Sequence, residues 1–323
     1  MGDSLAAALG DTLGGEVSGL VQLSGGASRE TWAFDLRRAG SDAAERLVLQ
    51  RGAAARHHLG IAQQGRLLEL ANAHGVPAPY VLHVSEGDQP FGAPAIVMQR
   101  VEGETIARRI LRDGAYAQSR TRIVAQCAQA LARLHAIDAT AAPYLDQPDQ
   151  LDFWRATLDS LGQPHPAFEI ALRWLEKNRP ATTRTAVVHG DFRLGNLVVD
   201  AGGLAAVLDW ELAHAGDPLE DLGWLCVKAW RFGAAHPVAG LGGYEELTAA
   251  YEAAGGVHLD RAALHWWETL GTLKWGIICI AQADKHLSGA TRSVELVTIG
   301  RRVCENEWDV LQCLDRAAEL AHG

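Results

Sequence analysis

The polar residues with the clearest chemical potential lie in one short stretch, residues 187–211, where two apolar runs flank an Ala-Gly-Gly turn centred on Gly202. Glycine between apolar runs is typical of a β-hairpin loop. A hairpin centred there brings Asn196 opposite Leu208 and beside Asp209, with directly paired residues about 5 Å apart at Cβ. An amide oxygen and a carboxylate suit a hard cation such as Mg²⁺, which completes its shell with substrate phosphates. The spacing therefore predicts a magnesium site formed by Asn196 and Asp209.

Asp191 precedes Asn196 by five residues, on the segment that leads into this hairpin. The position suits a carboxylate that orients or deprotonates a hydroxyl beside the metal. A base Asp, a metal-binding Asn five residues later, a hairpin and a metal-binding Asp form the order used in kinase phosphoryl transfer. Metal-dependent hydrolysis would normally need more histidines or carboxylates nearby, so the order favours a kinase with Asp191 as its catalytic group.

The elements that position these residues follow two patterns along the chain. The first hundred residues favour five short strands, near 19–23, 31–36, 46–50, 80–84 and 95–99, and one helix over about 61–74. Beyond them the periodicity is mainly helical, interrupted by short strands around the hairpin. The sequence therefore predicts an α+β fold. A small antiparallel sheet lobe with one helix would occupy residues 1–100, and a larger helical lobe with the catalytic loop and acceptor site would occupy 101–323.

The composition excludes several functional classes. The chain has 323 residues, 48% of them hydrophobic, and a formal net charge of −10, which argues against general electrostatic binding to nucleic acid. No apolar run is long enough for a membrane span, and the first twenty residues lack the basic residues of a targeting segment. Five widely spaced cysteines suggest neither a disulfide framework nor a zinc site. We expect a cytoplasmic protein that binds neither nucleic acid nor membrane; the sequence does not predict its oligomeric state.

The motifs together resemble the aminoglycoside phosphotransferase and choline kinase-like superfamily, which has a protein-kinase-like fold. The resemblance rests on His189-Gly190-Asp191 with Asn196, Asp209-Trp210-Glu211, Gly216-Asp217-Pro218, Asp221-Leu222, Gly25-Gly26-Ala27-Ser28, Gly75-Val76-Pro77, residues 97–103 and Ala132-Arg133-Leu134-His135. It covers nearly the whole chain. It implies two lobes with ATP bound between them, Asp191 as the catalytic base, and magnesium held by Asn196 and Asp209.

The other polar residues of these motifs are expected to support the loop, or have roles that the sequence does not decide. His189 is expected to be an internal hydrogen-bonding strut of the catalytic loop rather than an acid or base. Asp217 and Asp221 fit helix capping and support of that loop. Arg193 is a candidate substrate contact. Glu211 could touch substrate or a second cation, or it could be a solvated carboxylate, and the sequence leaves these alternatives open.

The resemblance also implies a nucleotide site in the first lobe. A glycine-rich segment would turn its backbone N–H groups and one hydroxyl toward the phosphates; its members are Ser24, Gly25, Gly26 and Ser28. Backbone groups of Gln99 and Val101 would meet the adenine, with Met98 behind it.

The third strand departs from the usual kinase pattern. Kinases of this fold hold the α- and β-phosphates with a lysine on this strand, paired to a helix glutamate. Alignment places Gln50 at the lysine position, followed by Arg51, and places Gln64 at the glutamate position. The ion pair would then become a Gln-Gln pair. Only four of the 29 cationic residues are lysines, and the first of them is Lys177, so no lysine of the first lobe can replace it.

Two functions are compatible with this departure. In the first, the chain is an active small-molecule kinase whose phosphates are held by Arg51 or Arg56, the glycine-rich segment and magnesium. In the second, it is a nucleotide-binding pseudokinase or regulator with weak or no transfer. The intact Asp191, Asn196 and Asp209 favour the first: an ATP- and Mg²⁺-dependent phosphotransferase acting on a small-molecule hydroxyl. The sequence does not identify the acceptor.

Overall fold

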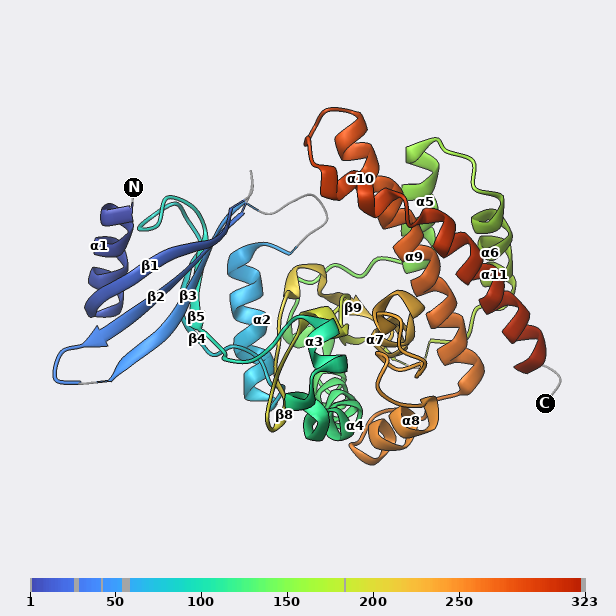
Figure 1. Ribbon diagram of the computed structural model, residues 1–323, viewed down its shortest axis with the longest axis horizontal. Helices are drawn as coiled ribbons and strands as arrows, with labels where there is room; N and C mark the ends of the chain where they lie inside the picture. Colours follow the sequence, from blue (N-terminus) through green and yellow to red (C-terminus); the bar gives the residue numbers. More distant parts are fainter. Residues whose placement is uncertain (1, 26–28, 42, 54–58, 183, 321–323) are drawn as a thin grey trace.

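The computed structural model describes residues 2–25, 29–41, 43–53, 59–182 and 184–320. It consists of two lobes, a sheet lobe formed by the first third of the chain and a larger helical lobe formed by the rest (Figure 1). The sheet is antiparallel with strand order β1-β2-β3-β5-β4. This arrangement confirms the predicted α+β, two-lobed, protein-kinase-like fold.

The first three strands of the sheet lobe are longer than the sequence patterns indicate, whereas the other predicted elements lie within one residue of their expected bounds. The elements of the lobe are α1 (Gly2–Leu13), β1 (Gly15–Gly25), β2 (Arg29–Arg38), β3 (Ala44–Gly52), α2 (Ile61–Ala73), β4 (Val81–Ser85) and β5 (Ala95–Gln99). Leu47 and Leu49 of β3 are buried on one face of the sheet, whereas Val48 packs on the other. This alternation decides which β3 side chains can reach the space between the lobes.

Helix α1 is an element that we did not expect from the sequence. Its residues Leu5, Leu9 and Leu13 recur every four positions and are buried against Phe34 and Leu47 on the outer face of the sheet. This spacing is the signature of an amphipathic helix. The prediction of one helix in this lobe was therefore wrong: α1 covers the outer face, and α2 covers the face toward the helical lobe (Figure 1).

The helical lobe surrounds two short two-stranded sheets. Its elements are α3 (Ala107–Arg112), η1 (Gly114–Tyr116), α4 (Ala117–His135), η2 (Ala139–Ala141), α5 (Gln150–Leu161), α6 (Pro166–Lys177), β6 (Ala186–Val188), η3 (Leu194–Asn196), β7 (Leu197–Asp200), β8 (Gly203–Val207), η4 (Trp210–Leu212), β9 (His214–Gly216), α7 (Leu219–Cys226), η5 (Lys228–Arg231), α8 (Tyr244–Ala253), α9 (Arg261–Leu287), α10 (Val294–Gly300) and α11 (Val303–Leu320). Strand β6 pairs with β9, and β7 pairs with β8. Among the described residues, none of the helices has the length and apolar character needed to cross a bilayer.

The two lobes share one hydrophobic core. Leu67, Leu68 and Ala71 of α2 belong to the same buried cluster as Met98 of β5 and the core of the helical lobe. The outer face of the sheet forms a separate cluster with α1. Helix α2 is therefore packed between the sheet and the helical lobe, next to the segment that contains the predicted catalytic residues.

Candidate active site

The β7–β8 hairpin positions Asn196 and Asp209 as the sequence predicts. Leu197 pairs with Val207, and the Leu208 N–H donates to the Asn196 carbonyl at 2.8 Å. The register shifts only between Val198 and Val199, close to the turn, so it does not affect the open end of the hairpin. The predicted register at the open end is confirmed.

Asp191 lies at this open end and is held by three donors. The indole N–H of Trp224 donates to Oδ1 at 2.8 Å, the Arg193 Nε–H donates to Oδ1 at 3.0 Å, and the Asn196 amide nitrogen donates to Oδ2 at 2.6 Å. Asp191 is buried, with 9% of its surface exposed. The carboxylate is thus fixed in orientation, and the Asn196 amide, whose nitrogen faces Asp191, offers its oxygen as a cation ligand.

Asp209 occupies a left-handed backbone conformation at the end of β8, with φ 66°. Asp and Asn adopt this conformation more readily than most residues because their short polar side chains bond locally. Asp209 is exposed as a residue, but the surrounding protein desolvates its carboxylate and penalises the negative charge. Burial raises the pKa of Asp209 to about 6, and the charges of Glu211 and Asp191 add to the shift. A carboxylate crowded by other carboxylates is a favourable position for a cation.

Glu211 binds an arginine of the sheet lobe. Arg29, the first residue of β2, forms an ion pair with Glu211 and also donates to the Leu59 carbonyl at 3.3 Å. The positive charge of Arg29 also acts to lower the pKa of Asp209. This ion pair links the two lobes beside the candidate metal site. Because 182 residues separate Arg29 from Glu211 in the chain, no local sequence pattern predicts the contact.

The loop that carries Asp191 is supported by His189 and Asp221. The Asp191 N–H donates to His189 Nδ1 at 3.2 Å, and His189 Nε2 donates to the Leu208 carbonyl at 3.0 Å. Burial lowers the pKa of His189, although Asp221 and Asp191 act in the opposite direction. This neutral, internally bonded histidine has the geometry of the strut that we expect from the sequence.

Asp221 accepts hydrogen bonds from the backbone of the same loop. Its carboxylate accepts from the N–H groups of His189 at 2.8 Å and Gly190 at 2.9 Å, and His135 Nε2 lies 3.1 Å away. Burial alone would raise the pKa of Asp221, but the hydrogen bond and charge of His135 lower it on balance. Gly190 has φ +77°, and a Cβ there would lie 2.4 Å from the Leu212 carbonyl oxygen, so only glycine fits this turn. Asp217 accepts from the Leu219 N–H at 2.9 Å at the first residue of α7, although the N-cap residue of this helix is Pro218 and not Asp217.

A buried lysine that sequence reasoning missed lies beneath this loop. Lys274 of α9 donates to the Gly190 carbonyl at 2.9 Å, lies 3.4 Å from the Glu220 carboxylate, and stacks over the Trp224 ring at 4.5 Å. Glu220 also contacts His214 Nε2 at 3.0 Å. Burial alone would lower the pKa of His214, but the Glu220 carboxylate outweighs it and raises the pKa. The chain's few lysines therefore include one that fixes the catalytic loop from below.

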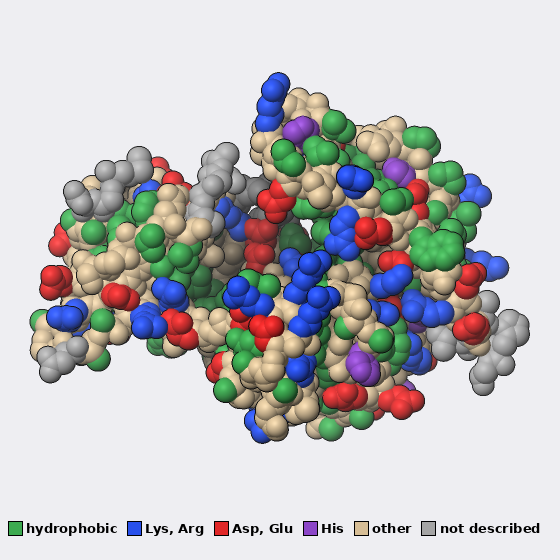
Figure 2. Space-filling model, in the orientation of Figure 1, with side chains coloured by type: hydrophobic (Ala, Val, Ile, Leu, Met, Phe, Trp, Pro, Cys, Tyr) green, Lys and Arg blue, Asp and Glu red, His purple; other side chains and the backbone are tan. Residues whose placement is uncertain are grey.

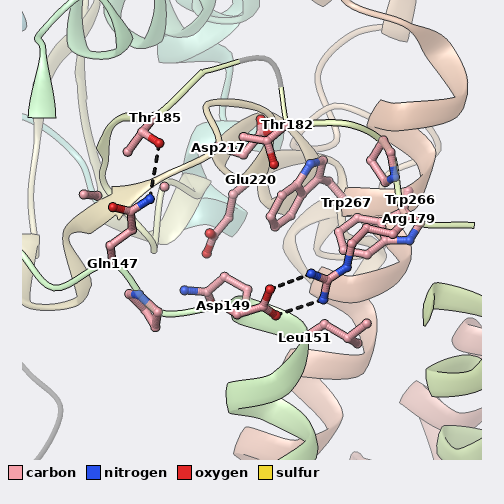
Figure 3. A pocket seen from close by; sticks show the side chains of 15 residues that line it. Gln147, Asp149, Leu151, Arg179, Thr182, Thr185, Asp217, Glu220, Trp266 and Trp267 are labelled. Atoms are coloured by element: carbon pink, nitrogen blue, oxygen red, sulfur yellow. Dashed lines mark hydrogen bonds and ion pairs between the residues drawn. The ribbon is translucent and has the colours of Figure 1, made fainter.

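Glu220 also lines a pocket on the far side of this network. Figure 3 shows Glu220 in the pocket near the Asp149–Arg179 ion pair, the hydrogen-bonded Gln147 and Thr185, and the indole of Trp267. The cavity measures about 220 Å³, and none of Asp191, Asn196 and Asp209 lines it. It is therefore separate from the predicted catalytic group.

The structure places Arg51 away from the space between the lobes. This corrects the expectation that Arg51 could hold the phosphates. Arg51 lies on the same face of β3 as Leu47 and Leu49, where its guanidinium pairs with Glu30 at 2.8 Å and donates to the Phe91 carbonyl at 2.5 Å. This is the α1 face. Arg51 therefore does not face the metal site, and Arg56, the other arginine considered, lies outside the described residues.

Gln50 lies on the opposite face of β3, beside Thr31 of β2 and Ile96 of β5. Gln64 is buried on α2, and its amide nitrogen donates to the Leu59 carbonyl at 2.6 Å. Among the described residues no hydrogen bond joins Gln50 to Gln64, so the predicted Gln-Gln pair is not formed. The uncharged Gln64 instead secures the segment that leads into α2.

The predicted nucleotide residues are only partly described. The backbones of Ser24 and Gly25 end β1 opposite Thr31 and Glu30, whereas Gly26 and Ser28 lie outside the described residues. Met98 is buried in β5. Gln99 ends that strand, and its N–H donates to the Tyr80 carbonyl at 2.8 Å.

Val101 follows in the segment between the lobes. In the part of the chain that the structure describes, its N–H has no hydrogen-bond acceptor. An unpaired backbone donor in this segment is suited to receive a ligand acceptor.

The donor set fits a magnesium ion that is completed by phosphates. Among the described residues there is no cluster of three or more His, Cys, Asp or Glu side chains that could hold a metal alone. One carboxylate and one amide oxygen at an anionic site are the few protein ligands that magnesium takes when phosphates supply the rest. Asp209 and Asn196 meet that description.

Comparisons with known proteins identify the family of the chain. Residues 19–267 match the phosphotransferase enzyme family. Among curated proteins the chain is similar to acyl-CoA dehydrogenase family member 10 of Mus musculus, with 35% identity over 169 residues that cover 49% of this chain and 16% of that protein. It is also 33% identical over 168 residues to acyl-CoA dehydrogenase family member 11 of the same organism, covering 47% and 21%. The match thus spans about a fifth or less of these relatives.

Solved structures show the same fold at low identity. A protein of Ralstonia eutropha JMP134 assigned to the aminoglycoside phosphotransferases has a TM-score of 0.76 and 20% identity, covering 97% of this chain and 98% of that one. Spectinomycin phosphotransferase in complex with ADP and spectinomycin has a TM-score of 0.66 and 12% identity, covering 97% and 98%. Macrolide 2′-phosphotransferase of Brachybacterium faecium has a TM-score of 0.62 and 18% identity, covering 93% and 97%. With a family match over more than three quarters of its length, the chain belongs to the phosphotransferase enzyme family.

Proposed function

We propose that this phosphotransferase uses ATP and Mg²⁺ and moves the γ-phosphate to a hydroxyl of a small molecule. The observation that carries the proposal is the meeting of Asp191, Asn196 and Asp209 at the open end of the β7–β8 hairpin. The family match supports phosphoryl transfer. The bound ADP of the spectinomycin phosphotransferase supports a nucleotide as the donor.

Asp191 is the residue that would align the acceptor. Its carboxylate accepts the hydrogen bond of the incoming hydroxyl and directs that oxygen toward the phosphorus. Three donors keep the carboxylate from rotating: Trp224 donates to Oδ1, Asn196 donates to Oδ2, and the Arg193 Nε–H is shared between both oxygens. The rate enhancement assigned to this group is that of a positioned general base, about 10²- to 10⁴-fold.

Asn196 and Asp209 would hold the magnesium ion. Bound there, magnesium would supply charge neutralisation on the phosphate oxygens. The left-handed backbone at Asp209 directs its carboxylate from the end of β8, and the hydrogen bond from Asn196 Nδ2 to Asp191 sets the orientation of the amide. These two residues thus tie the metal site to the catalytic carboxylate.

Among the described residues, Arg29 is the cation best placed to bind phosphates in place of the missing lysine. It begins β2 beside the glycine-rich segment, and it reaches Glu211 of the helical lobe. Its charge acts on Asp209, whereas Arg51 is paired on the other face of the sheet. Glu211 balances the charge of Arg29 in their ion pair. Phosphates entering the site would compete with Glu211 for it.

Replacing Arg29 by glutamine should weaken magnesium-ATP binding. A charge-assisted hydrogen bond contributes about 1.5–3 kcal/mol, and exchange with Glu211 offsets part of it, so we expect Kd to rise about tenfold. Isothermal titration calorimetry measures this directly. Arg51→Gln is the matched control on the same sheet and should leave Kd nearly unchanged. The assignment fails if Arg51→Gln weakens binding and Arg29→Gln does not.

The setting proposed from the sequence is a reducing cytoplasm with a small-molecule acceptor. Cys127, Cys226, Cys279 and Cys313 are buried and Cys304 is exposed, and all five are free thiols, which supports a reducing compartment. The net charge of −10 supports an acceptor other than nucleic acid.

The proposal is tested by acceptor-dependent release of ADP. The chain is incubated with ATP, Mg²⁺ and a panel of hydroxyl-bearing metabolites and aminoglycosides in a coupled ADP assay. We expect at least one acceptor to raise ADP release above the solvent rate, and we expect EDTA to abolish the increase. Calorimetry with ATP and Mg²⁺, run in parallel, tests the alternative that the chain binds nucleotide without transferring phosphate. Tight magnesium-ATP binding without transfer to any acceptor would identify a nucleotide-binding pseudokinase.

A further inference from the structure

The site at the open end of the β7–β8 hairpin is acidic. Figure 2 shows Asp and Glu side chains in the hollow between the two lobes. Burial and the charges of Glu211 and Asp191 raise the pKa of Asp209 to about 6, and the charges of Arg193 and Arg29 act in the opposite direction. A phosphoryl group in transfer brings further negative charge to this site, so the arginines decide how well that charge is tolerated.

Arg193 uses only one of its donor groups within the chain. Its Nε–H is shared between the oxygens of Asp191, at 3.0 Å from Oδ1 and 3.2 Å from Oδ2. Across the described residues, the two amino groups Nη1 and Nη2 of this guanidinium have no hydrogen-bond partner. Neither belongs to the buried polar atoms that lack a partner, and the side chain is 24% exposed. Both groups are therefore open to a ligand beside the catalytic carboxylate.

The guanidinium of Arg193 is held in place by its surroundings. It stacks over the ring of Trp230 at 4.6 Å, and that ring is buried against Trp224 at 5.1 Å and Trp275 at 4.7 Å. A Cβ at Gly195 would lie 2.3 Å from Nη1, so the glycine leaves the room that the guanidinium occupies. Donors that are oriented before a ligand arrives stabilise developing charge without a cost of reorganisation.

From this arrangement we infer that Arg193 is a further catalytic residue, whose free Nη groups bind the γ-phosphoryl group while it passes from ATP to the acceptor. The inference rests on the proposed function. In this transfer an electron pair of the acceptor oxygen forms the new bond to phosphorus. The bond from phosphorus to the bridging oxygen breaks, and its electron pair leaves with ADP. The acceptor proton goes to the Asp191 carboxylate, and Arg193 gives up no proton.

The ion pair with Asp191 makes Arg193 act on the transition state more than on bound ATP. Before transfer, the Asp191 carboxylate balances part of the charge of Arg193. When Asp191 takes up the acceptor proton it becomes neutral, and the charge of Arg193 is then left for the phosphoryl oxygens. An interaction that strengthens in the transition state raises kcat with little effect on substrate binding. Arg193 should therefore affect kcat, whereas Arg29 should affect the Kd of the nucleotide.

Arg193→Gln tests this role with little change in geometry. The amide nitrogen of glutamine is as many bonds from the backbone as Nε of arginine, so glutamine can keep the donor to Asp191 while both Nη groups and the charge are lost. We expect kcat to fall about 10²- to 10³-fold, the range for loss of a donor that faces developing charge, with the Kd for magnesium-ATP nearly unchanged. Arg122→Gln, at an exposed position of α4, is the matched control and should keep full turnover.

A mimic of the transferred phosphoryl group gives a second measurement that needs no acceptor. ADP and Mg²⁺ are titrated by calorimetry with and without aluminium fluoride, whose anion takes the place of the phosphoryl group beside ADP. We expect aluminium fluoride to tighten ADP binding about tenfold or more in the wild type and in Arg122→Gln, and to have little effect in Arg193→Gln. Binding of ADP alone shows that each variant is folded. No effect of aluminium fluoride on the wild type overturns the inference.

The outcomes for Arg193 and for the proposed function are distinguishable. Wild-type turnover by Arg193→Gln, together with loss of turnover in Asp191→Asn, overturns the role of Arg193 and leaves the phosphotransferase proposal standing. A higher KM for the acceptor with unchanged kcat does the same, because it would make Arg193 an acceptor contact. If Arg193→Gln loses the aluminium fluoride effect but the wild type releases no ADP with any acceptor, the transfer is overturned and the phosphoryl contact stands.

Discussion

Replacing Asp191 by asparagine is expected to lower kcat about 10²- to 10⁴-fold, the range for loss of a positioned general base. Asparagine keeps the size of the side chain and can still accept from Trp224, so the loop should remain folded. Because Asp191 is not assigned to the nucleotide, the Kd for magnesium-ATP should change little. The two quantities are measured by ADP release and by calorimetry.

Two further variants serve as a control and as a test of the metal site. Asp159→Asn, an exposed aspartate on α5, should keep full turnover. Asp209→Asn should weaken the magnesium-dependent part of ATP binding, because it removes a ligand charge, and it should fold well because asparagine accepts the same backbone conformation. Equal turnover of wild type and Asp191→Asn would remove Asp191 from the mechanism.

Replacing Lys274 by methionine should destabilise the protein by about 3–5 kcal/mol, the usual consequence of removing one partner of a buried ion pair. Lys274 is 5% exposed, so its loss leaves Glu220 facing His214 alone and leaves the Gly190 carbonyl without its donor. The same substitution should reduce turnover, because Gly190 precedes Asp191 directly. Chemical denaturation measures the stability loss.

Lys285→Met provides the matched control, since Lys285 lies on the same helix but is exposed. It should change stability by no more than about 0.5 kcal/mol. The double variant Lys274→Met/Glu220→Gln should recover part of the loss, because it removes the unpaired charge. If the two single lysine variants unfold at the same denaturant concentration, Lys274 does not support the loop.

Local patterns were sufficient to predict the hairpin and the sheet. Strand β5 was predicted at its observed bounds, and the register of the β7–β8 hairpin follows from its turn composition, because pairing across a short loop has little freedom. Helix α1 was not predicted, although Leu5, Leu9 and Leu13 carry a helical spacing. The information for that element was present in the sequence.

Contacts between distant segments could not be predicted in the same way. Whether Gln50 or Arg51 faces the space between the lobes depends on which face of β3 is outermost, and the buried Leu47 and Leu49 settle this only once α1 is known to cover them. Arg29 meets Glu211 across 182 residues, and Lys274 meets Gly190 across 84. No spacing rule connects such pairs, since their proximity arises from the packing of whole lobes.

The position of α2 in one continuous core restricts how the cleft can open. Leu67, Leu68 and Ala71 belong to one buried cluster with β5 and the helical lobe. Moving the sheet away as a rigid body would expose the contact between α2 and the sheet, and moving the sheet together with α2 would expose the contact between α2 and the helical lobe. Sliding of packed surfaces preserves most of that contact area. We therefore expect the lobes to adjust to a bound nucleotide by a shear of the sheet across α2, restrained by the Arg29–Glu211 ion pair, rather than by rotation about the segment after residue 99.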